Sequence, residues 1–240
     1  MVKTAMIMAA GLGSRFGHYT DLIPKGFVEI GGKPMIIRSI DTLLACGIKR
    51  IVIGTGYKNE AYEDLKKDYP MIETCYSPRY AETNSMYTLY NTRELIGDDD
   101  FLLLESDLIF DKNAINGLLE CPEPDVMLIT PVTKFQDQYY VEYDEKHILT
   151  RCSVNKNEVN AKGELVGIHK LSNVFYKKMC ADYAQIVDGQ PKLGYEYELL
   201  RMSQYVSPVY VLNAQNVKWY EIDDPQDLKY AEEYVLSYCE

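Results

Sequence analysis

The chain has 240 residues, 47% of them hydrophobic, and a formal net charge of −11 at pH 7. This length and composition are enough to bury a sizeable core without disulfides or a structural metal. The negative charge argues against nucleic acid or an anionic membrane as a partner, because no basic face could dominate it. Anionic substrates would therefore need a local group of Lys and Arg side chains or a bound cation.

Cysteine and histidine positions exclude the common metal and disulfide frameworks. The six cysteines are scattered and form no Cys-x-x-Cys pair, which indicates reduced thiols. His18, His147 and His169 are too far apart in sequence for a zinc motif. The N-terminal apolar stretch at 5–10 is too short for a signal peptide or anchor, and no later stretch could span a bilayer. We therefore expect a soluble, cytoplasmic protein.

The first half alternates short apolar runs with helical patterns, which is typical of a largely parallel sheet covered by helices. In chain order we expect a strand at 5–10, a helix at 34–46, a strand at 50–54, a polar helix near 60–69, a helix near 84–95 and a strand at 101–104. Pro34 suits the first turn of its helix and Gly47 the C-terminal stop. The wholly apolar run at 101–104 is expected of a central strand buried on both faces.

The second half has a different pattern. Runs at 139–143 and 165–168, separated by polar turns, indicate antiparallel strands. Helices are expected near 172–186 and 195–204, followed by strands near 208–212 and 217–222. The last helix opens with Asp224 as N-cap and Pro225 at the first helical position. With no repeat or linker, the sequence predicts one α/β domain. Its Rossmann-like, mostly parallel sheet is flanked by helices, with a smaller antiparallel part in the second half.

A glycine-rich loop follows the first expected strand. It reads Ala9-Ala10-Gly11-Leu12-Gly13-Ser14-Arg15, and Pro24-Lys25 comes after eight further residues. Glycines at this place let the backbone approach a phosphate, with free N–H groups pointing at its oxygens. A dinucleotide-binding loop shares the first two glycines, but here the third stands at Gly17, one place late, which disfavours a nicotinamide-dependent oxidoreductase. A Walker lysine motif is also absent from the sequence.

This loop with its two cations resembles the signature of the GT-A-like nucleotidyltransferases, which transfer a nucleoside monophosphate from a nucleoside triphosphate to a small phosphorylated or phosphonylated compound. The resemblance implies that Arg15 holds the β- and γ-phosphates and that Lys25 reaches the α-phosphate. Two fixed cations there would stabilise the transition state and the leaving pyrophosphate. The nucleotide-binding residues that the resemblance implies in this loop are Ala9, Ala10, Gly11, Gly13 and Ser14.

Two aspartates are candidate ligands for Mg²⁺. Asp107 follows the strand at 101–104, at the carboxyl end where open α/β sheets bind ligands. Asp223 precedes the last helix, and because Asp224 already occupies the capping position, Asp223 is free for another role. In the resembled family, aspartates at these two places bind the catalytic metal, and Mg²⁺ commonly takes one or two carboxylates plus substrate phosphates.

The chain lacks the later Glu-Lys-Pro segment and the C-terminal β-helix of many sugar-phosphate nucleotidyltransferases. Over nearly its whole length it resembles the small cytidylyltransferases that activate phosphocholine or 2-aminoethylphosphonate. Segments 103–107, 163–168 and 195–197 look closest to the 2-aminoethylphosphonate branch. The resemblance implies CTP as donor, with cytosine against the first loop and the segment of Asn84 and Ser85. It also implies that the chain could be the N-terminal domain of an aminotransferase fusion; a homodimer is compatible with the sequence.

The acceptor is expected to meet Tyr139, Tyr140, Glu196 and Tyr197, which makes the antiparallel part the acceptor-binding part. A choline head favours an aromatic cage, whereas a primary ammonium favours carboxylates and carbonyls. Glu196 therefore favours 2-aminoethylphosphonate, and phosphocholine or phosphoethanolamine is the alternative. The tyrosines also fit a plain packed strand face. A non-catalytic nucleotide-sensing domain is the alternative from another class.

Overall fold

The computed structural model describes residues 2–133 and 138–239. The strands of its large sheet are β1 (Thr4–Ala9), β4 (Arg50–Thr55), β5 (Ile72–Tyr76), β6 (Phe101–Glu105), β8 (Val126–Thr130), β9 (Tyr140–Tyr143), β10 (Leu149–Ser153), β11 (Gly163–Leu171) and β12 (Tyr210–Asn213). Two small strand pairs are β2 (Glu29–Ile30) with β3 (Lys33–Pro34), and β7 (Leu108–Phe110) with β13 (Trp219–Glu221).

The α-helices are α1 (Met35–Ala45), α2 (Asn59–Asp64), α3 (Ser85–Asn91), α4 (Arg93–Ile96), α5 (Lys112–Glu120), α6 (Asn173–Tyr183), α7 (Tyr195–Tyr205) and α8 (Pro225–Tyr234). Short 3₁₀ helices are η1 (Ser14–Thr20), η2 (Lys25–Phe27), η3 (Leu65–Lys67), η4 (Lys156–Glu158) and η5 (Leu236–Tyr238). Within the described ranges, no helix has the length and apolar character needed to cross a membrane.

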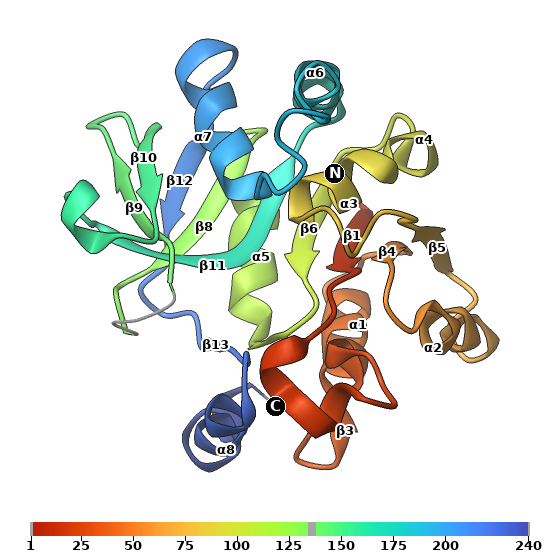
Figure 1. The fold of residues 1–240 in the computed structure, drawn as a ribbon. Coiled ribbons are helices and arrows are strands. Elements are labelled where there is room, and N and C mark those ends of the chain that lie inside the picture. Colours follow the sequence, from red (N-terminus) through yellow and green to blue (C-terminus); the bar gives the residue numbers. More distant parts are fainter. Residues whose placement is uncertain (1, 134–137, 240) are drawn as a thin grey trace.

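The sheet combines a parallel and an antiparallel part (Figure 1). Its main path runs β10-β9-β11-β6-β1-β4-β5, and β8 pairs with both β11 and β12. Strands β6, β1, β4 and β5 are parallel, whereas β11 is antiparallel to β6, β8 and β9. The predicted α/β fold, with a mostly parallel sheet and a smaller antiparallel part in the second half, is confirmed.

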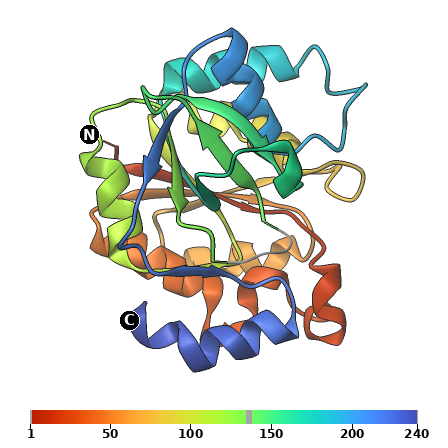
Figure 2. The same ribbon diagram turned by 90° about the vertical axis from the view of Figure 1, so that its left-hand side faces the viewer.

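Helices cover both faces of this sheet, and Figure 2 shows the layers from the side. Helices α1, α2 and α5 pack on one face, where alternate strand residues such as Ile7 and Leu104 form one core. Helices α3, α4, α6 and α7 pack on the other face, where Met6 and Leu103 belong to a second core. Strands buried on both faces explain why the run at 101–104 is wholly apolar.

A third, smaller core fixes the C-terminal helix beside the glycine-rich loop. Phe16 of η1 packs there with Ile222 and Ala231, from either side of the start of α8. The Asp224 side chain caps α8 by accepting from the backbone N–H groups of Gln226 and Asp227, as predicted for an N-cap aspartate. This core therefore holds the start of α8, and with it Asp223, beside η1.

Several elements differ from the sequence prediction. The expected helix near 84–95 is divided into α3 and α4 at Thr92, whose hydroxyl donates to the Leu89 carbonyl. Residues 14–20, for which no element was expected, form η1, in which the Thr20 hydroxyl bonds back to the carbonyls of Gly13 and Gly17. Strands β5, β7, β8 and β10 and helix α5 are further elements that were not predicted from the sequence.

Candidate active site

A cavity of about 340 Å³ opens at the carboxyl ends of β1 and β6. It gathers residues from the glycine-rich loop, the start of α3, the β6–β7 turn, the first turn of α7 and the segment before α8. The predicted site residues that line it are Ala9, Ala10, Gly11, Gly13, Arg15, Lys25, Asn84, Ser85, Asp107, Tyr139, Glu196 and Asp223. Of the predicted residues in the described ranges, Ser14, Tyr140 and Tyr197 do not line this cavity.

The glycine-rich loop is braced so that its backbone faces the cavity. Gly13 has φ of +65°, and a Cβ at this position would lie 3.1 Å from both Lys25 Cβ and Thr20 Cγ2. The backbone N–H of Tyr57 donates to the Ala10 carbonyl at 3.2 Å. Around Gly11, by contrast, no described atom lies within 4 Å of an added Cβ. Ser14 is exposed at the start of η1. The loop thus leaves open space beside Gly11, as close approach of a phosphate requires.

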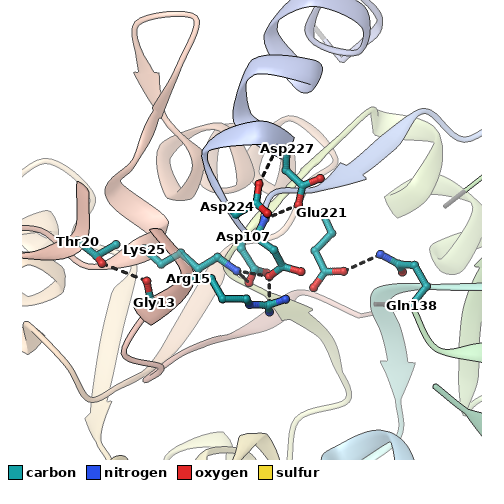
Figure 3. Close-up of polar contacts among 10 residues, drawn as sticks. Gly13, Arg15, Thr20, Lys25, Asp107, Gln138, Glu221, Asp224 and Asp227 are labelled. Atoms are coloured by element: carbon teal, nitrogen blue, oxygen red, sulfur yellow. Dashed lines mark hydrogen bonds and ion pairs between the residues drawn. The ribbon is translucent and has the colours of Figure 1, made fainter. Parts of the chain in front are cut away.

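The two predicted cations and the two predicted metal ligands form one ion-pair network (Figure 3). Lys25 Nζ donates to Asp107 Oδ2 at 2.5 Å and to Asp223 Oδ1 at 2.6 Å. Arg15 Nη2 donates to the same Asp223 oxygen at 2.7 Å. Burial by itself would lower the pKa of Lys25, but the charges of Asp107 and Asp223 outweigh it and raise that pKa above its ordinary value. Lys25 therefore stays charged.

Strand pairing explains why residues so distant in sequence meet. Strands β7 and β13 pair in antiparallel fashion, with Glu221 opposite Leu108. The backbone N–H of Ile222 donates to the Asp107 carbonyl at 2.9 Å, just beyond this pair. The aspartates at the two strand ends are therefore held face to face across Lys25.

Two further carboxylates, Glu105 and Glu221, belong to the site, and the sequence analysis missed them. One carboxylate oxygen from each of Glu105, Asp107 and Glu221 lies within 4.8 Å of the others. Gln138 Nε2 donates to Glu221 Oε2 at 3.0 Å. The available signal was the repeated Glu-x-Asp spacing, at 105–107 and again at 221–223.

Crowding of these carboxylates disfavours their charged forms. Burial, followed by the charges of Asp107 and Glu196, raises the pKa of Glu105 to about 8. Burial and the charge of Glu105 raise the pKa of Glu221 well above its usual value. Asp107 Oδ1 is buried and has no hydrogen-bond partner among the described residues. An all-oxygen set with one orphaned oxygen fits Mg²⁺, whose charge would favour the ionised carboxylates.

Glu196 and Tyr139 form another wall of the cavity. Glu196 is only 6% exposed, and its Oε2 has no hydrogen-bond partner in the described part of the chain. Burial raises the pKa of Glu196 to about 7. The backbone of Gly194 lies close to this oxygen, since a Cβ at that position would lie 2.4 Å from Glu196 Oε2. The neighbouring Glu198 faces elsewhere and pairs with Arg201 at 3.1 Å.

The remaining predicted acceptor residues are placed differently. Tyr197 is half-buried, packs its ring edge-on against Tyr139 at 5.5 Å between centroids, and lines a shallow neighbouring pocket with it. Tyr140 is 2% exposed and has the ammonium of Lys156 over its ring at 5.7 Å. The side chains of Tyr139 and Tyr140 point to opposite faces because they are consecutive in an extended segment.

Asn84 and Ser85 join the start of α3 to the start of α7. Asn84 Oδ1 caps α3 by accepting from the Ser85 backbone N–H at 2.8 Å, and its Nδ2 donates to the Lys192 carbonyl at 3.3 Å. Ser85 Oγ accepts from the backbone N–H of Tyr195 at 3.0 Å. Since these side chains already have protein partners, the segment shapes the cavity wall mainly through its backbone.

Residues 5–205 match the sequence profile of the MobA-like NTP transferase domain. The CMP-5'-(3-aminopropyl)phosphonate synthase of Streptomyces rubellomurinus is 25% identical over 240 residues, which cover 95% of this chain and 38% of that protein. The 2-aminoethylphosphonate cytidylyltransferase of Lancefieldella rimae is 32% identical over 111 residues, which cover 46% of this chain and 45% of that protein. The matched segments thus span less than half of either relative's length.

Among solved structures, the CTP:phosphocholine cytidylyltransferase from Streptococcus pneumoniae has a similar fold. Its TM-score is 0.81 at 25% sequence identity, and the superposition covers 97% of this chain and 99% of that chain. Such complete coverage means that the parallel and antiparallel parts of the sheet are both shared.

Proposed function

Because the chain belongs to the MobA-like NTP transferase family, we propose that it is a cytidylyltransferase that transfers CMP from CTP to 2-aminoethylphosphonate. The products are CMP-2-aminoethylphosphonate and pyrophosphate. The observation that carries the acceptor is the buried Glu196 Oε2 in the cavity, which accepts no hydrogen bond from the described residues. Relatives named for aminoalkyl phosphonates support the same choice.

The proposed reaction is a direct in-line displacement. A phosphonate oxygen of the acceptor attacks the α-phosphorus of CTP, and the bond from that phosphorus to the β-phosphate oxygen breaks. The nucleophile is already anionic at neutral pH, so no general base is needed. Catalysis then consists of positioning and charge stabilisation.

Arg15 and Lys25 are proposed as the catalytic cations. Lys25 meets the charge that grows on the α-phosphate, while Arg15 holds the β- and γ-phosphates. The backbone around Gly11 and Gly13 receives phosphate oxygens. Both cations are paired with aspartates, and binding of the nucleotide would exchange these partners for phosphate oxygens.

Mg²⁺ is the proposed cofactor, held by Asp107 and Asp223. When bound it would neutralise phosphate charge and polarise the reacting phosphoryl group. Among the described residues that line the cavity, two basic side chains face five carboxylates, so a triphosphate needs an additional cation to bind there.

The acceptor wall is proposed to recognise a primary ammonium through Glu196, with Tyr139 and Tyr197 beside it. Cytosine is proposed to lie against backbone of the loop and of the Asn84–Ser85 segment. Phosphocholine or phosphoethanolamine is the alternative acceptor, supported by the overall similarity to a phosphocholine enzyme. Tyr140, buried away from the cavity, is not retained as an acceptor contact.

We also propose that residues 1–240 form one nucleotidyltransferase domain in the cytoplasm, which can equally be the N-terminal part of an aminotransferase fusion. A homodimer, the absence of a nucleic-acid partner and the absence of a membrane partner remain expectations from the sequence. None of these proposals affects the chemistry assigned to the cavity.

The test is release of pyrophosphate by the purified protein with Mg²⁺, each of four nucleoside triphosphates and each candidate acceptor. We expect CTP with 2-aminoethylphosphonate to give the fastest release. Release with a different nucleotide would contradict the assignment of CTP. If nucleotide binds but no pair yields pyrophosphate, the nucleotide-sensing alternative holds instead.

A further inference from the structure

A chain of polar side chains runs from the core beneath α7 to the cavity. The Tyr195 hydroxyl donates to Glu105 Oε1 at 2.6 Å, and His169 Nε2 lies 3.0 Å from the same hydroxyl. His169 and Tyr195 are fully buried, and their rings meet edge-on with centroids 5.3 Å apart. Two core residues therefore orient one carboxyl group of the cavity.

The direction of these hydrogen bonds follows from which of the atoms carry a proton. Burial lowers the pKa of His169 to about 3, so its ring is neutral and carries a single N–H. The one hydroxyl proton of Tyr195 goes to Glu105, so the tyrosine oxygen must accept from His169 Nε2–H. His169 Nδ1 is then the bare nitrogen, in agreement with its lack of a partner among the described residues. His169 thus donates to Tyr195, and Tyr195 donates to Glu105.

The backbone of β11 makes room for this carboxyl group. Gly167 has φ of +79°, in the left-handed region that favours glycine. A Cβ at this position would lie 3.0 Å from Glu105 Cδ and 3.2 Å from Oε2. The pairing register of β11 with β8 also shifts between Leu165 and His169, on either side of this glycine. The strand is thus locally irregular where it passes Glu105.

A purely structural role does not explain a carboxyl group held in this way. One of its oxygens lies within 4.8 Å of one oxygen of Asp107 and one of Glu221, where like charges repel. A glutamine could accept the same hydrogen bond from Tyr195 without that repulsion. Carboxylate oxygens at this spacing are suitable ligands for a hard divalent cation, and Asp107 contributes an orphaned oxygen beside them.

We propose that Glu105 is a further ligand of the divalent cation, with Tyr195, backed by His169, as its positioning residue. The inference depends on the proposed function only in requiring that such a cation binds. Hydrogen-bond partners that fix a ligand typically change metal affinity about 10–100-fold when they are removed. Glu105 joins Asp107 and Asp223 in this assignment.

The experiment uses Mn²⁺ as the probe and measures free Mn²⁺ by electron paramagnetic resonance, with the full chain and without nucleotide or acceptor. Glu105→Gln should weaken binding of Mn²⁺ at least about tenfold, although glutamine can still accept from Tyr195 and keep the core intact. Tyr195→Phe should weaken binding about tenfold. Because the assay contains neither nucleotide nor acceptor, its result does not depend on whether the protein transfers CMP.

Tyr176→Phe is the matched control, because Tyr176 belongs to the same core and its hydroxyl donates to the Leu89 carbonyl, away from the cavity. This variant should bind Mn²⁺ like the wild type. Unchanged affinity in Glu105→Gln would overturn the proposal. So would a wild-type protein that binds no Mn²⁺ at millimolar concentration, or an equal loss of affinity in Tyr176→Phe and Tyr195→Phe.

Discussion

Two walls of the cavity differ in how the chain builds them: one is the loop region, within residues 9–25, and the other is the α7 region, which consists of residues 138–139 and Glu196. The loop region is a contiguous motif that offers backbone N–H groups and two cations. The α7 region is assembled from segments far apart in sequence and offers buried side chains, among them Glu196. A backbone site suits phosphates, which are common to all nucleotides, whereas side chains with buried polar atoms can discriminate among acceptors.

Exchange of either aspartate of the proposed metal site should have the largest effect on turnover. Asp107→Asn or Asp223→Asn should lower turnover by at least on the order of 10³, because metal ligation contributes several kcal/mol of transition-state stabilisation. Steady-state pyrophosphate release at limiting Mg²⁺ measures the loss, and circular dichroism checks the fold.

Asp224→Asn is the control for this exchange, because asparagine caps a helix as well as aspartate does and Asp224 already serves only as the cap. It should keep nearly full turnover. Near wild-type turnover in Asp107→Asn would instead remove Asp107 from the proposed metal site.

Loss of Lys25 should have the next largest effect. Lys25→Ala should lower kcat about 10²–10³-fold, since the lysine is proposed to meet charge that develops in the transition state. The affinity for CTP, measured by calorimetry, should change less. Lys33→Ala, which removes a lysine paired with Asp41 outside the cavity, should leave kcat unchanged. A Lys25→Ala enzyme with weaker CTP binding and normal kcat would limit the lysine to ground-state binding.

Glu196 of the α7 region should make the stability of the folded protein depend on pH. The pKa of Glu196 is raised to about 7 in the folded protein, so the folded state binds a proton more readily than the unfolded chain. Its contribution to stability is therefore full below about pH 4.5 and is lost as pH rises through about 7. Thermal unfolding of the ligand-free protein should follow that sign.

Glu196→Gln should flatten this pH dependence and raise the Tm at pH 8 by about 2–4 °C for each kcal/mol of relieved destabilisation. Glu142→Gln, in the half-exposed part of β9, should leave the profile unchanged. A wild-type Tm that rises between pH 5 and pH 8, with no difference in Glu196→Gln, would contradict the assigned burial cost.

The two regions also differ in how far the sequence could predict them. The loop could be found because its residues are adjacent and follow a strand. Asp107 and Asp223 could be found as candidate ligands, but their contacts with Lys25 could not, because these depend on the pairing of β7 with β13. The sequence could not show which of Tyr139 and Tyr140 faces the cavity, because consecutive side chains of an extended segment point to opposite faces.

Other misses have local causes. Helix α5 buries only Ala114, Ile115 and Leu118 from nine residues, which is a weak helical signal in sequence. Glu105 could not be predicted as a site residue, because a carboxylate at the end of an apolar strand is ordinarily exposed to solvent. The contact with Tyr195, 90 residues away, gives it a different role.

The most direct test of the account is a competition between equal concentrations of 2-aminoethylphosphonate and phosphocholine for limiting CTP, with products separated by ³¹P NMR. The wild type should form mainly CMP-2-aminoethylphosphonate. Glu196→Gln should reduce that preference about tenfold, since a hydrogen bond to a charged group contributes about 1.5–3 kcal/mol. Glu198→Gln, two residues along α7 and paired with Arg201, should keep the preference. A wild type that prefers phosphocholine, or a Glu196→Gln enzyme with an unchanged product ratio, would contradict the central claim.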